Sequence, residues 1–340
     1  MRARDLGLAC GTLPTGERNT IADVPGVTVG HATLIHGDTR TGVTAVLPHS
    51  GDLFRDKPIA AAVVLNGFGK STGLVQVNEL GTLETPILLT NTFAVGTCAN
   101  ALIRRAIATN PEIGRKTSTV NPVVLECNDS YLNDIQAMAI TEDHAFAAID
   151  AASDTFRSGS VGAGTGMSCF GLKGGIGSAS RRLHLDGAPC HLGVLVLANF
   201  GRAGDLRLPD GTRIDPSVTP TAEAGSCIIV IGTDVPLDHR QLTRIAKRVG
   251  VGLSWCGSFW GNGSGDIALA FTTANRISHT PDCDIIAHRL LAEQRIDVLF
   301  QAVAEATQEA VLDALAAAET TLGRNGHWRT GLRDLLPRVT

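Results

Sequence analysis

Ser264 stands between two glycines in the stretch Phe259 to Thr273, FWGNGSGDIALAFTT, just before residues that alternate as in a β-strand. The simplest interpretation is a turn, because Asn262 and Gly263 form the Asn-Gly pair that is typical of tight turns. A serine after a glycine also suits a different chemistry. If the backbone is held under strain, the Ser264 hydroxyl could attack the carbonyl of Gly263, which has no Cβ to obstruct a bent conformation.

Such an attack would be an N-to-O acyl shift, and it would produce an ester that water cleaves. The product would have Ser264 as a new N-terminus. An α-amine ordinarily has a pKa of about 7.7 to 8, so this one could then serve as the general base for its own hydroxyl. The residues alone leave both interpretations open, an inert turn or a nucleophile.

Three better-known active-site patterns are incomplete in this chain. GKST at 69–72 lacks the glycine five residues earlier that a phosphate-binding P-loop needs, since Val64 stands there. VGAGTG at 161–166 lacks the glycine spacing of a dinucleotide-binding loop and follows no apolar strand. Ser264 has glycines one residue away on either side rather than two, so it is not a nucleophile elbow. Conventional serine hydrolase chemistry therefore has no local signature.

Metal and cofactor sites have little support in the sequence. The eight cysteines never form a C-x-x-C pair, and the ten histidines show no H-x-x-x-H on a helical pattern. The cysteines have the character of small buried hydrophobic residues. We therefore expect neither a metal nor a cofactor.

Composition and charge limit the class of protein. A chain of 340 residues with 44% hydrophobic and 18% charged residues can bury a large core. A net charge of -4 without a basic block argues against nucleic acid as a partner. The apolar stretches are too short to span a bilayer, and the first residues lack the apolar region of a signal peptide. We expect a soluble cytoplasmic protein that does not bind membranes.

The periodicity predicts mixed α and β structure. Helices are expected at 96–110, at 237–250 with Asp238 as N-cap and Gly250 as the end, and from Asp297 to Gly323. Apolar segments bounded by Gly, Pro, Asn or Asp predict strands at 60–67, 85–92, 121–128, 191–201, 226–234 and 266–273. Several of these strands are apolar throughout, which indicates cover on both faces. Helix layers outside a sheet core are therefore expected.

Long segments resemble the DmpA-type L-aminopeptidase/D-esterase family, which includes the β-peptidyl aminopeptidases and is similar to the nylon-oligomer hydrolases. The segments are NGSGDIALAFTT, TIADVPGVTVGHATL, PILLTNTFAVG, ECNDSYLNDI, VGAGTGMSCFGLKGGIGSASR, VLVLANFG and EATQEAVLDALAAAETTLGRNGH. The resemblance implies an α/β fold, a four-layer αββα sandwich of the DmpA/ornithine-acetyltransferase type. It also implies one domain over residues 1–340, cut into an α-chain of 1–263 and a β-chain of 264–340 that assembles as a homo-oligomer, a tetramer of αβ units.

The activity that the resemblance implies is that of a self-processing serine aminopeptidase of the N-terminal-nucleophile type. Ser264 matches the nucleophile, and the cut falls between Gly263 and Ser264. Asn199 matches an asparagine near the oxyanion, where an amide NH2 is a suitable donor, although an asparagine ending a strand also suits a turn. Lys173 matches a lysine near the nucleophile in the nylon hydrolases, and a solvated loop lysine is the alternative.

The substrate-binding positions follow from the same resemblance. Glu126 is expected to bind the ammonium of an N-terminal residue through a charge-assisted hydrogen bond. Asn128 stands where relatives carry another residue, such as a tyrosine that helps hold the oxyanion, which leaves its role open. Asn133 shapes the same loop or caps a helix. Asp297 is the candidate for an acidic residue that orients the nucleophile, with N-cap of the last helix as the alternative.

Other functions stay open at this stage. An acyltransferase similar to the ornithine acetyltransferases would also cut itself, but those enzymes use threonine, and the serine here counts against that interpretation. A polyamide hydrolase of the nylon-oligomer type would share the nucleophile. A small-molecule binding module with an inert turn at Ser264 would leave the chain whole. Small peptides, amino-acid amides or esters, and β-peptides are the candidate substrates.

Overall fold

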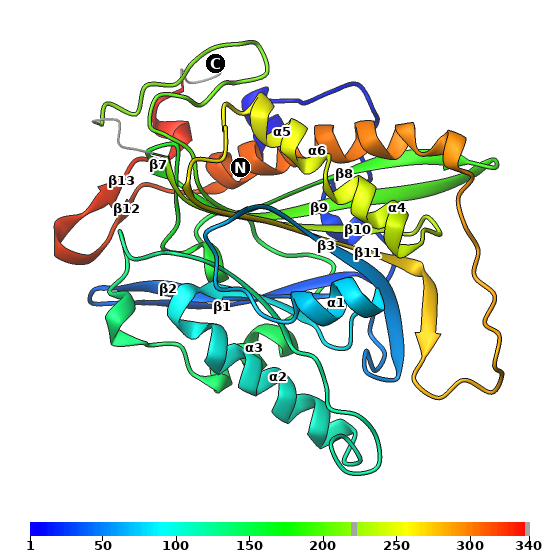
Figure 1. The fold of residues 1–340 in the computed structure, drawn as a ribbon. Coiled ribbons are helices and arrows are strands. Elements are labelled where there is room, and N and C mark those ends of the chain that lie inside the picture. The colour runs from blue at the N-terminus through cyan, green and yellow to red at the C-terminus, as the bar shows by residue number, and fades with distance from the viewer. Residues whose placement is uncertain (219–222, 337–340) are drawn as a thin grey trace.

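The computed structural model describes residues 1–218 and 223–336, and it stacks two β-sheets face to face (Figure 1). The five-stranded sheet has the order β3-β11-β10-β9-β8, and the four-stranded sheet has the order β1-β2-β4-β5. The first sheet consists of β3 (Asp56–Gly67), β8 (Gly175–Leu185), β9 (Ala188–Asn199), β10 (Ala224–Thr233) and β11 (Gly263–Ser278). The second consists of β1 (Thr28–His36), β2 (Thr39–Leu47), β4 (Ile87–Asn91) and β5 (Val123–Cys127).

Helices cover the outer face of each sheet. On the five-stranded sheet lie α4 (His239–Ala246) and α6 (Asp297–Ala317), and α5 (Val249–Trp255) packs against α6. On the four-stranded sheet lie α2 (Val95–Thr109) and α3 (Glu142–Asp150). The remaining elements are α1 (Leu74–Leu80) beside β3, and the short pairs β6 (Ser168–Cys169) with β7 (Leu172–Lys173) and β12 (Thr321–Leu322) with β13 (Trp328–Arg329). The order of layers is helix, sheet, sheet, helix, which confirms the expected αββα sandwich.

Side chains along the central strands point alternately to the two faces of the sheet, and this explains the layers. In β9, Leu195 and Leu197 face the other sheet, whereas Val194 and Val196 face the helices. In β11, Ile267 and Leu269 face the other sheet in the same way. Because successive side chains point to opposite faces, a strand buried on both sides is apolar throughout. The two-sided burial predicted from the sequence is therefore confirmed.

All six predicted strands are present, and the predicted helices differ from the structure at their ends. Asp238 caps α4 as expected, since its carboxylate accepts the backbone N–H of Gln241. Gly250, however, lies inside α5 and does not end the helical segment. A Cβ on Gly250 would collide with the ring of Trp260, so this glycine serves close packing. The last helix ends at Ala317, six residues before the predicted end.

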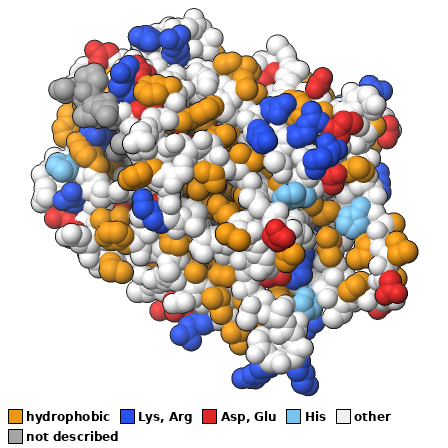
Figure 2. Space-filling view, viewed as in Figure 1, with side chains coloured by type: hydrophobic (Ala, Val, Ile, Leu, Met, Phe, Trp, Pro, Cys, Tyr) orange, Lys and Arg blue, Asp and Glu red, His pale blue; other side chains and the backbone are white. Residues whose placement is uncertain are grey.

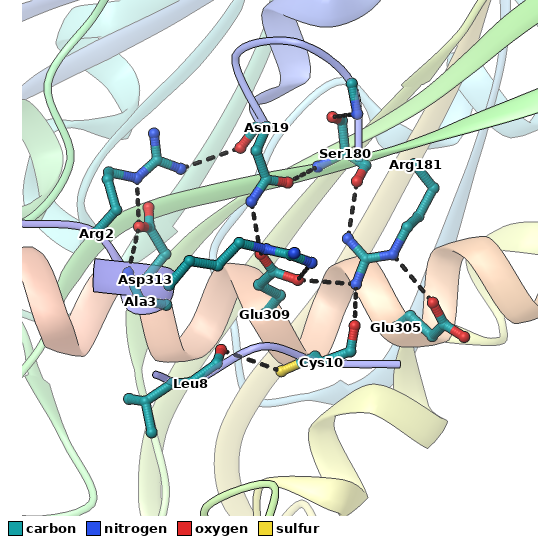
Figure 3. A network of polar contacts seen from close by, with 12 residues as sticks. Arg2, Ala3, Leu8, Cys10, Asn19, Ser180, Arg181, Glu305, Glu309 and Asp313 are labelled. Carbon is teal, nitrogen blue, oxygen red and sulfur yellow. Dashed lines mark hydrogen bonds and ion pairs between the residues drawn. The ribbon is translucent and has the colours of Figure 1, made fainter. Parts of the chain in front are cut away.

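A buried network of ion pairs fixes α6 to β8 and to the N-terminal segment (Figure 3). Arg181 of β8 has no exposed surface and pairs with Glu305 and Glu309 of α6, at 3.0 and 2.9 Å. Arg4 adds a second ion pair to Glu309 at 2.6 Å. Buried charges are tolerated only when they are paired in this way. Each pair joins a residue that precedes the Gly263–Ser264 bond in the sequence to one that follows it.

On the face shown in Figure 2, basic, acidic and hydrophobic side chains are interspersed over the surface. Arg240 of α4, for example, pairs with Glu293 at 2.7 Å. Within residues 1–218 and 223–336, no helix has the length and apolar character needed to cross a membrane.

Candidate active site

Ser264 is the second residue of β11 and has no exposed surface. Its strand lies between β10, with which it pairs in parallel, and β3, with which it pairs in antiparallel fashion. A turn precedes it, closed by the backbone N–H of Ser264 on the carbonyl of Gly261 at 2.9 Å. Trp260, at the start of this turn, has a φ of +53°, which is rare for a bulky side chain. The Gly263–Ser264 bond is thus held where a constrained turn enters a central strand.

Asp266 is the closest polar partner of the Ser264 hydroxyl. Oγ of Ser264 donates to Oδ1 of Asp266 at 3.0 Å, and Asp266 has no exposed surface. Burial raises the pKa of the Asp266 carboxyl to about 6, against the opposing effect of the Ser264 hydrogen bond, and the nearby Glu223 carboxylate raises this pKa further. A carboxylate with a raised pKa is a stronger base than an exposed aspartate.

Glu223 holds the turn that leads to Ser264. Its carboxylate accepts the hydroxyl of Ser258 at 2.7 Å and the backbone N–H of Gly261 at 3.1 Å. On the opposite side, the amide of Asn66 in β3 donates to the carbonyls of Gly261 and Ser264. Side chains from two separate segments therefore fix the backbone on both sides of Gly263.

Glu126, at the end of β5, lies beside the strand of the nucleophile. A Cβ built on Gly69 would be 3.7 Å from Oε1 of Glu126 and 3.9 Å from Cα of Gly265, so one glycine separates the two. Glu126 is only 2% exposed, and it accepts the backbone N–H of Lys70 at 2.8 Å and the hydroxyl of Thr92. Each carboxylate oxygen can accept a further hydrogen bond, so this side chain could also bind an ammonium group.

Asn199 ends β9 on the face that looks toward the other sheet. Its amide NH2 donates to the backbone carbonyl of Asn128 at 2.9 Å, and its Oδ1 accepts the backbone N–H of Ser168 at 2.9 Å. These two bonds fix which way the amide points and leave one N–H for another acceptor. Ser264 and Asp266, in contrast, lie on the same face of β11 as Ala268, and this face is directed toward the helices. The structure therefore does not bring Asn199 against the Ser264 hydroxyl.

Lys173 contacts the glycine-rich loop of residues 162–175 and not Ser264. Its ammonium is fully buried and donates to the carbonyls of Gly164, Met167 and Gly174 at 2.9, 3.0 and 2.8 Å. Burial lowers the pKa of Lys173 to about 7. A Cβ on Gly164 or Gly174 would collide with neighbouring backbone, so these glycines allow close backbone packing. Ser168 of this loop fixes Asn199, so Lys173 acts on the site through the loop.

The two other asparagines of the predicted site shape the loop after β5. Asn128 is exposed, and its side chain accepts the backbone N–H of Ser130, so its backbone carbonyl is the group that meets Asn199. Asn133 is buried and bridges Oδ1 of Asp129 to the backbone N–H of Arg40. The loop-shaping role expected of Asn133 fits these contacts.

Asp297 is not brought to the nucleophile. The segment that enters α6 is bonded to Pro236, just past the end of β10. The β10–β11 pairing covers residues 263 to 272 of β11, and the eight residues from Ser264 to its end place that end of the sheet about 26 Å from Ser264. Asp297 is exposed, and Ile296 rather than Asp297 occupies the N-cap position of α6. The structure therefore supports neither the orienting role nor the N-cap role of Asp297.

Comparison with known proteins gives one consistent result. The family model of peptidase family S58 matches residues 19–329. The β-peptidyl aminopeptidase BapA of Sphingosinicella microcystinivorans is 38% identical over 354 residues, which cover 96% of this chain and 88% of the relative. A β-aminopeptidase structure from Burkholderia sp. matches with a TM-score of 0.88 and 38% identity, over 99% of this chain and 100% of that one.

A further solved structure, the L-aminopeptidase D-Ala-esterase/amidase of Ochrobactrum anthropi, has a variant of the N-terminal-nucleophile hydrolase fold. It matches with a TM-score of 0.89 and 33% identity, over 97% of this chain and 95% of that one. Both the family match and these relatives extend over nearly the whole chain. The chain therefore belongs to peptidase family S58 and is a hydrolase of peptide bonds with the N-terminal-nucleophile hydrolase fold.

Proposed function

We propose that the chain cuts itself between Gly263 and Ser264 and then acts as an aminopeptidase with Ser264 as its nucleophile. The relatives are named a β-peptidyl aminopeptidase and an L-aminopeptidase D-Ala-esterase/amidase. Residues 1–263 would form the α-chain, and residues 264–340 the β-chain. The two would stay together, because β11 pairs with strands on both sides and α6 is held by Arg181.

The observation that carries this proposal is the position of Glu126 beside the strand of Ser264. An aminopeptidase must hold the ammonium of the first residue at one residue's length from the scissile carbonyl. Glu126 and Gly265 lie within 4 Å of the same point, the Cβ position on Gly69. A buried carboxylate at that position can form a charge-assisted hydrogen bond with an ammonium group but not with a blocked amine.

The reaction would proceed through an acyl-enzyme. Freed from Gly263, the Ser264 side chain could turn from the helix face of β11 toward Glu126 and Asn199. The hydroxyl would attack the substrate carbonyl while its own α-amine takes the proton, and the leaving amine would receive that proton. The free N–H of Asn199 is the candidate donor to the oxyanion. Water would then hydrolyse the ester and regenerate Ser264.

The substrates we propose are small peptides, amino-acid amides and esters with a free amine, including β-peptides. We also propose that the chain assembles as a homo-oligomer, as its resemblance to this family implies. A cytoplasmic location is supported by eight free cysteines, which a reducing compartment preserves.

A substrate panel tests the proposal. Aminoacyl p-nitroanilides of α- and β-amino acids should be hydrolysed, and their N-acetylated counterparts should react at least about tenfold more slowly because a charge-assisted contact is lost. A slow ester substrate, trapped by acid, should leave its acyl group on the fragment that begins with Ser264. Equal rates for free and acetylated substrates, or label on another residue, would contradict the proposal.

A further inference from the structure

The Ser264–Asp266 pair lies inside the uncut chain, sealed from solvent. Both residues are 0% exposed, and the two side chains leave β11 on the same face because they are two residues apart. Oδ1 of Asp266 accepts the Ser264 hydroxyl at 3.0 Å. Its second oxygen, Oδ2, has no hydrogen-bond partner among the residues that the structure describes. A buried carboxylate oxygen without a partner is costly and calls for a functional reason.

The uncut chain needs a base that the mature enzyme would not need. The α-amine proposed as the base of the mature enzyme is still a peptide nitrogen before the cut, and a peptide nitrogen cannot accept a proton at neutral pH. Another group must therefore accept the Ser264 proton during self-cleavage. Asp266 is the titratable side chain that the structure places in hydrogen-bond contact with that hydroxyl.

The surroundings of Asp266 make it a suitable base. The titratable groups that face it are the carboxylate of Glu223 and the thiols of Cys127 and Cys227. Burial raises the pKa of both thiols well above the usual value, so they stay neutral. Burial, with Glu223, raises the pKa of Asp266 to about 6, so that its carboxylate is ionised at neutral pH and more basic than usual.

We propose that the Asp266 carboxylate accepts the Ser264 hydroxyl proton when the chain cuts itself at Gly263. This inference rests on the proposed function, since it assigns a residue to its self-cleavage step. Oγ of Ser264 forms a bond to the carbonyl carbon of Gly263, and the proton passes from Oγ to Asp266. The C–N bond then breaks, and the proton passes from Asp266 to the departing Ser264 nitrogen. Water finally hydrolyses the ester, giving the Gly263 carboxylate and free Ser264.

Glu223 contributes to the same step as a positioning residue. It holds Ser258 and the N–H of Gly261, and the carbonyl of Gly261 in turn accepts the N–H of Ser264. These hydrogen bonds restrain the turn that carries the scissile bond. Glu223 also raises the pKa of Asp266, so one side chain affects both geometry and basicity.

The test measures the rate of cleavage at Gly263–Ser264 in the whole chain, which is labelled during cell-free translation. Samples are quenched in denaturant at intervals and separated on gels. Asp266→Asn keeps the size of the side chain and removes the base, so the cleavage rate should fall by about a hundredfold or more. Asp234→Asn is the matched control. Asp234 follows β10 at the other end of the same sheet and pairs with His191, so its substitution should leave the rate unchanged.

A pH profile of the wild-type chain gives a second readout, independent of how Asp266→Asn folds. Because the base must be deprotonated, the cleavage rate should rise with pH and level off above about pH 6. Asp266→Glu, which retains a carboxylate, should recover part of the rate and the same rise.

The outcomes separate this inference from the proposed function. Wild-type chain that is cut, with Asp266→Asn uncut and Asp234→Asn cut normally, supports both. Asp266→Asn cut at the wild-type rate, or a wild-type rate that does not change between pH 5 and 7, overturns the role of Asp266 alone. A wild-type chain that stays whole overturns the proposed function and this inference with it.

Discussion

Asn199 of β9 and Gly265 of β11 both pair with Ser226 of β10, so Asn199 lies two strand spacings from the residue after Ser264. Two spacings are about 9 to 10 Å, which leaves room for a substrate carbonyl between them. The side chain of Asn199 faces the other sheet, whereas Ser264 in the uncut chain faces the helices. The geometry therefore suits a role for Asn199 in turnover better than a role in self-cleavage.

Replacing Asn199 by alanine should consequently leave the chain cut but slow its catalysis. Loss of one oxyanion donor lowers kcat by about a hundred- to a thousandfold. Asn128→Ala is the matched control, because only the backbone carbonyl of Asn128 meets Asn199 and that carbonyl remains. Gels of both variants and kcat for one aminoacyl p-nitroanilide give the answer. An uncut Asn199→Ala chain would place Asn199 in the cleavage step instead.

Glu126→Gln should retain folding and self-cleavage, since Ser264 has no free amine before the cut for Glu126 to recognise. Turnover of substrates with a free amine should fall by roughly ten- to a thousandfold, which corresponds to about 1.5 to 4 kcal/mol for a lost charge-assisted contact. N-acetylated substrates should lose little. Glu79→Gln, on the exposed surface of α1, should change neither rate. If Glu126→Gln blocks the cut, Glu126 belongs to the cleavage machinery.

Lys173→Met should lower stability, because it leaves three buried carbonyls without their donor. We expect a loss of about 2 to 4 kcal/mol in the free energy of unfolding. Denaturant unfolding measures it, in a Ser264→Ala background so that one intact chain unfolds. The exposed Lys116→Met is the control. Equal stability of the two variants would show that the loop does not depend on Lys173.

The same pair of variants should differ in their dependence on pH. The pKa of Lys173 is lowered to about 7 in the folded chain, whereas an unfolded lysine has a pKa of about 10.4. Between these values the unfolded chain holds a proton that the folded chain lacks, so the contribution of Lys173 to stability rises with pH. The stability deficit of Lys173→Met should therefore grow from pH 7 to pH 9. A deficit that stays constant over this range would show that Lys173 keeps its charge in the folded chain.

Turnover by the mature enzyme should depend on pH through a different group from self-cleavage. If the Ser264 α-amine is the base, kcat/KM should rise through an apparent pKa within about one unit of 7.7 to 8. The cleavage step should instead rise near pH 6. Activity that stays flat from pH 6 to 9 would mean that another residue takes the proton during turnover.

Much of the fold could be predicted from the sequence because the central strands are buried on both faces. A run such as residues 227–232 is apolar throughout, and this pattern can be recognised without knowing which strands pair with it. β8 was not predicted, since it carries Ser178, Ser180 and Arg181, which are residue types typical of a surface. Arg181 is buried because α6, more than a hundred residues later, supplies the charges that pair with it. The hydroxyls of Ser178 and Ser180 donate to the Val194 carbonyl and to Asp23. The Asp186–Gly187 hairpin turn was the local signal available for this strand.

Only part of the candidate site could be proposed from the sequence, for a similar reason. Ser264 and Glu126 lie in distinctive segments, so their positions could be identified. Asp266 was missed although it follows Ser264 by two residues, the spacing that places two side chains on one face of a strand. The partners of Lys173 are backbone carbonyls, which every residue carries, so the sequence does not reveal them. Glu223 reaches the site only through the pairing of β10 with β11.

The state of the Gly263–Ser264 bond in purified protein tests the central claim most directly. Denaturing gels and intact mass should show two fragments from the wild-type chain, with N-terminal sequencing of the smaller one reading Ser-Gly-Asp-Ile. Ser264→Ala should give one folded, inactive chain, because no hydroxyl remains to attack Gly263. A wild-type protein that hydrolyses aminoacyl substrates while its mass is that of the uncut chain would contradict the role of Ser264 as an N-terminal nucleophile.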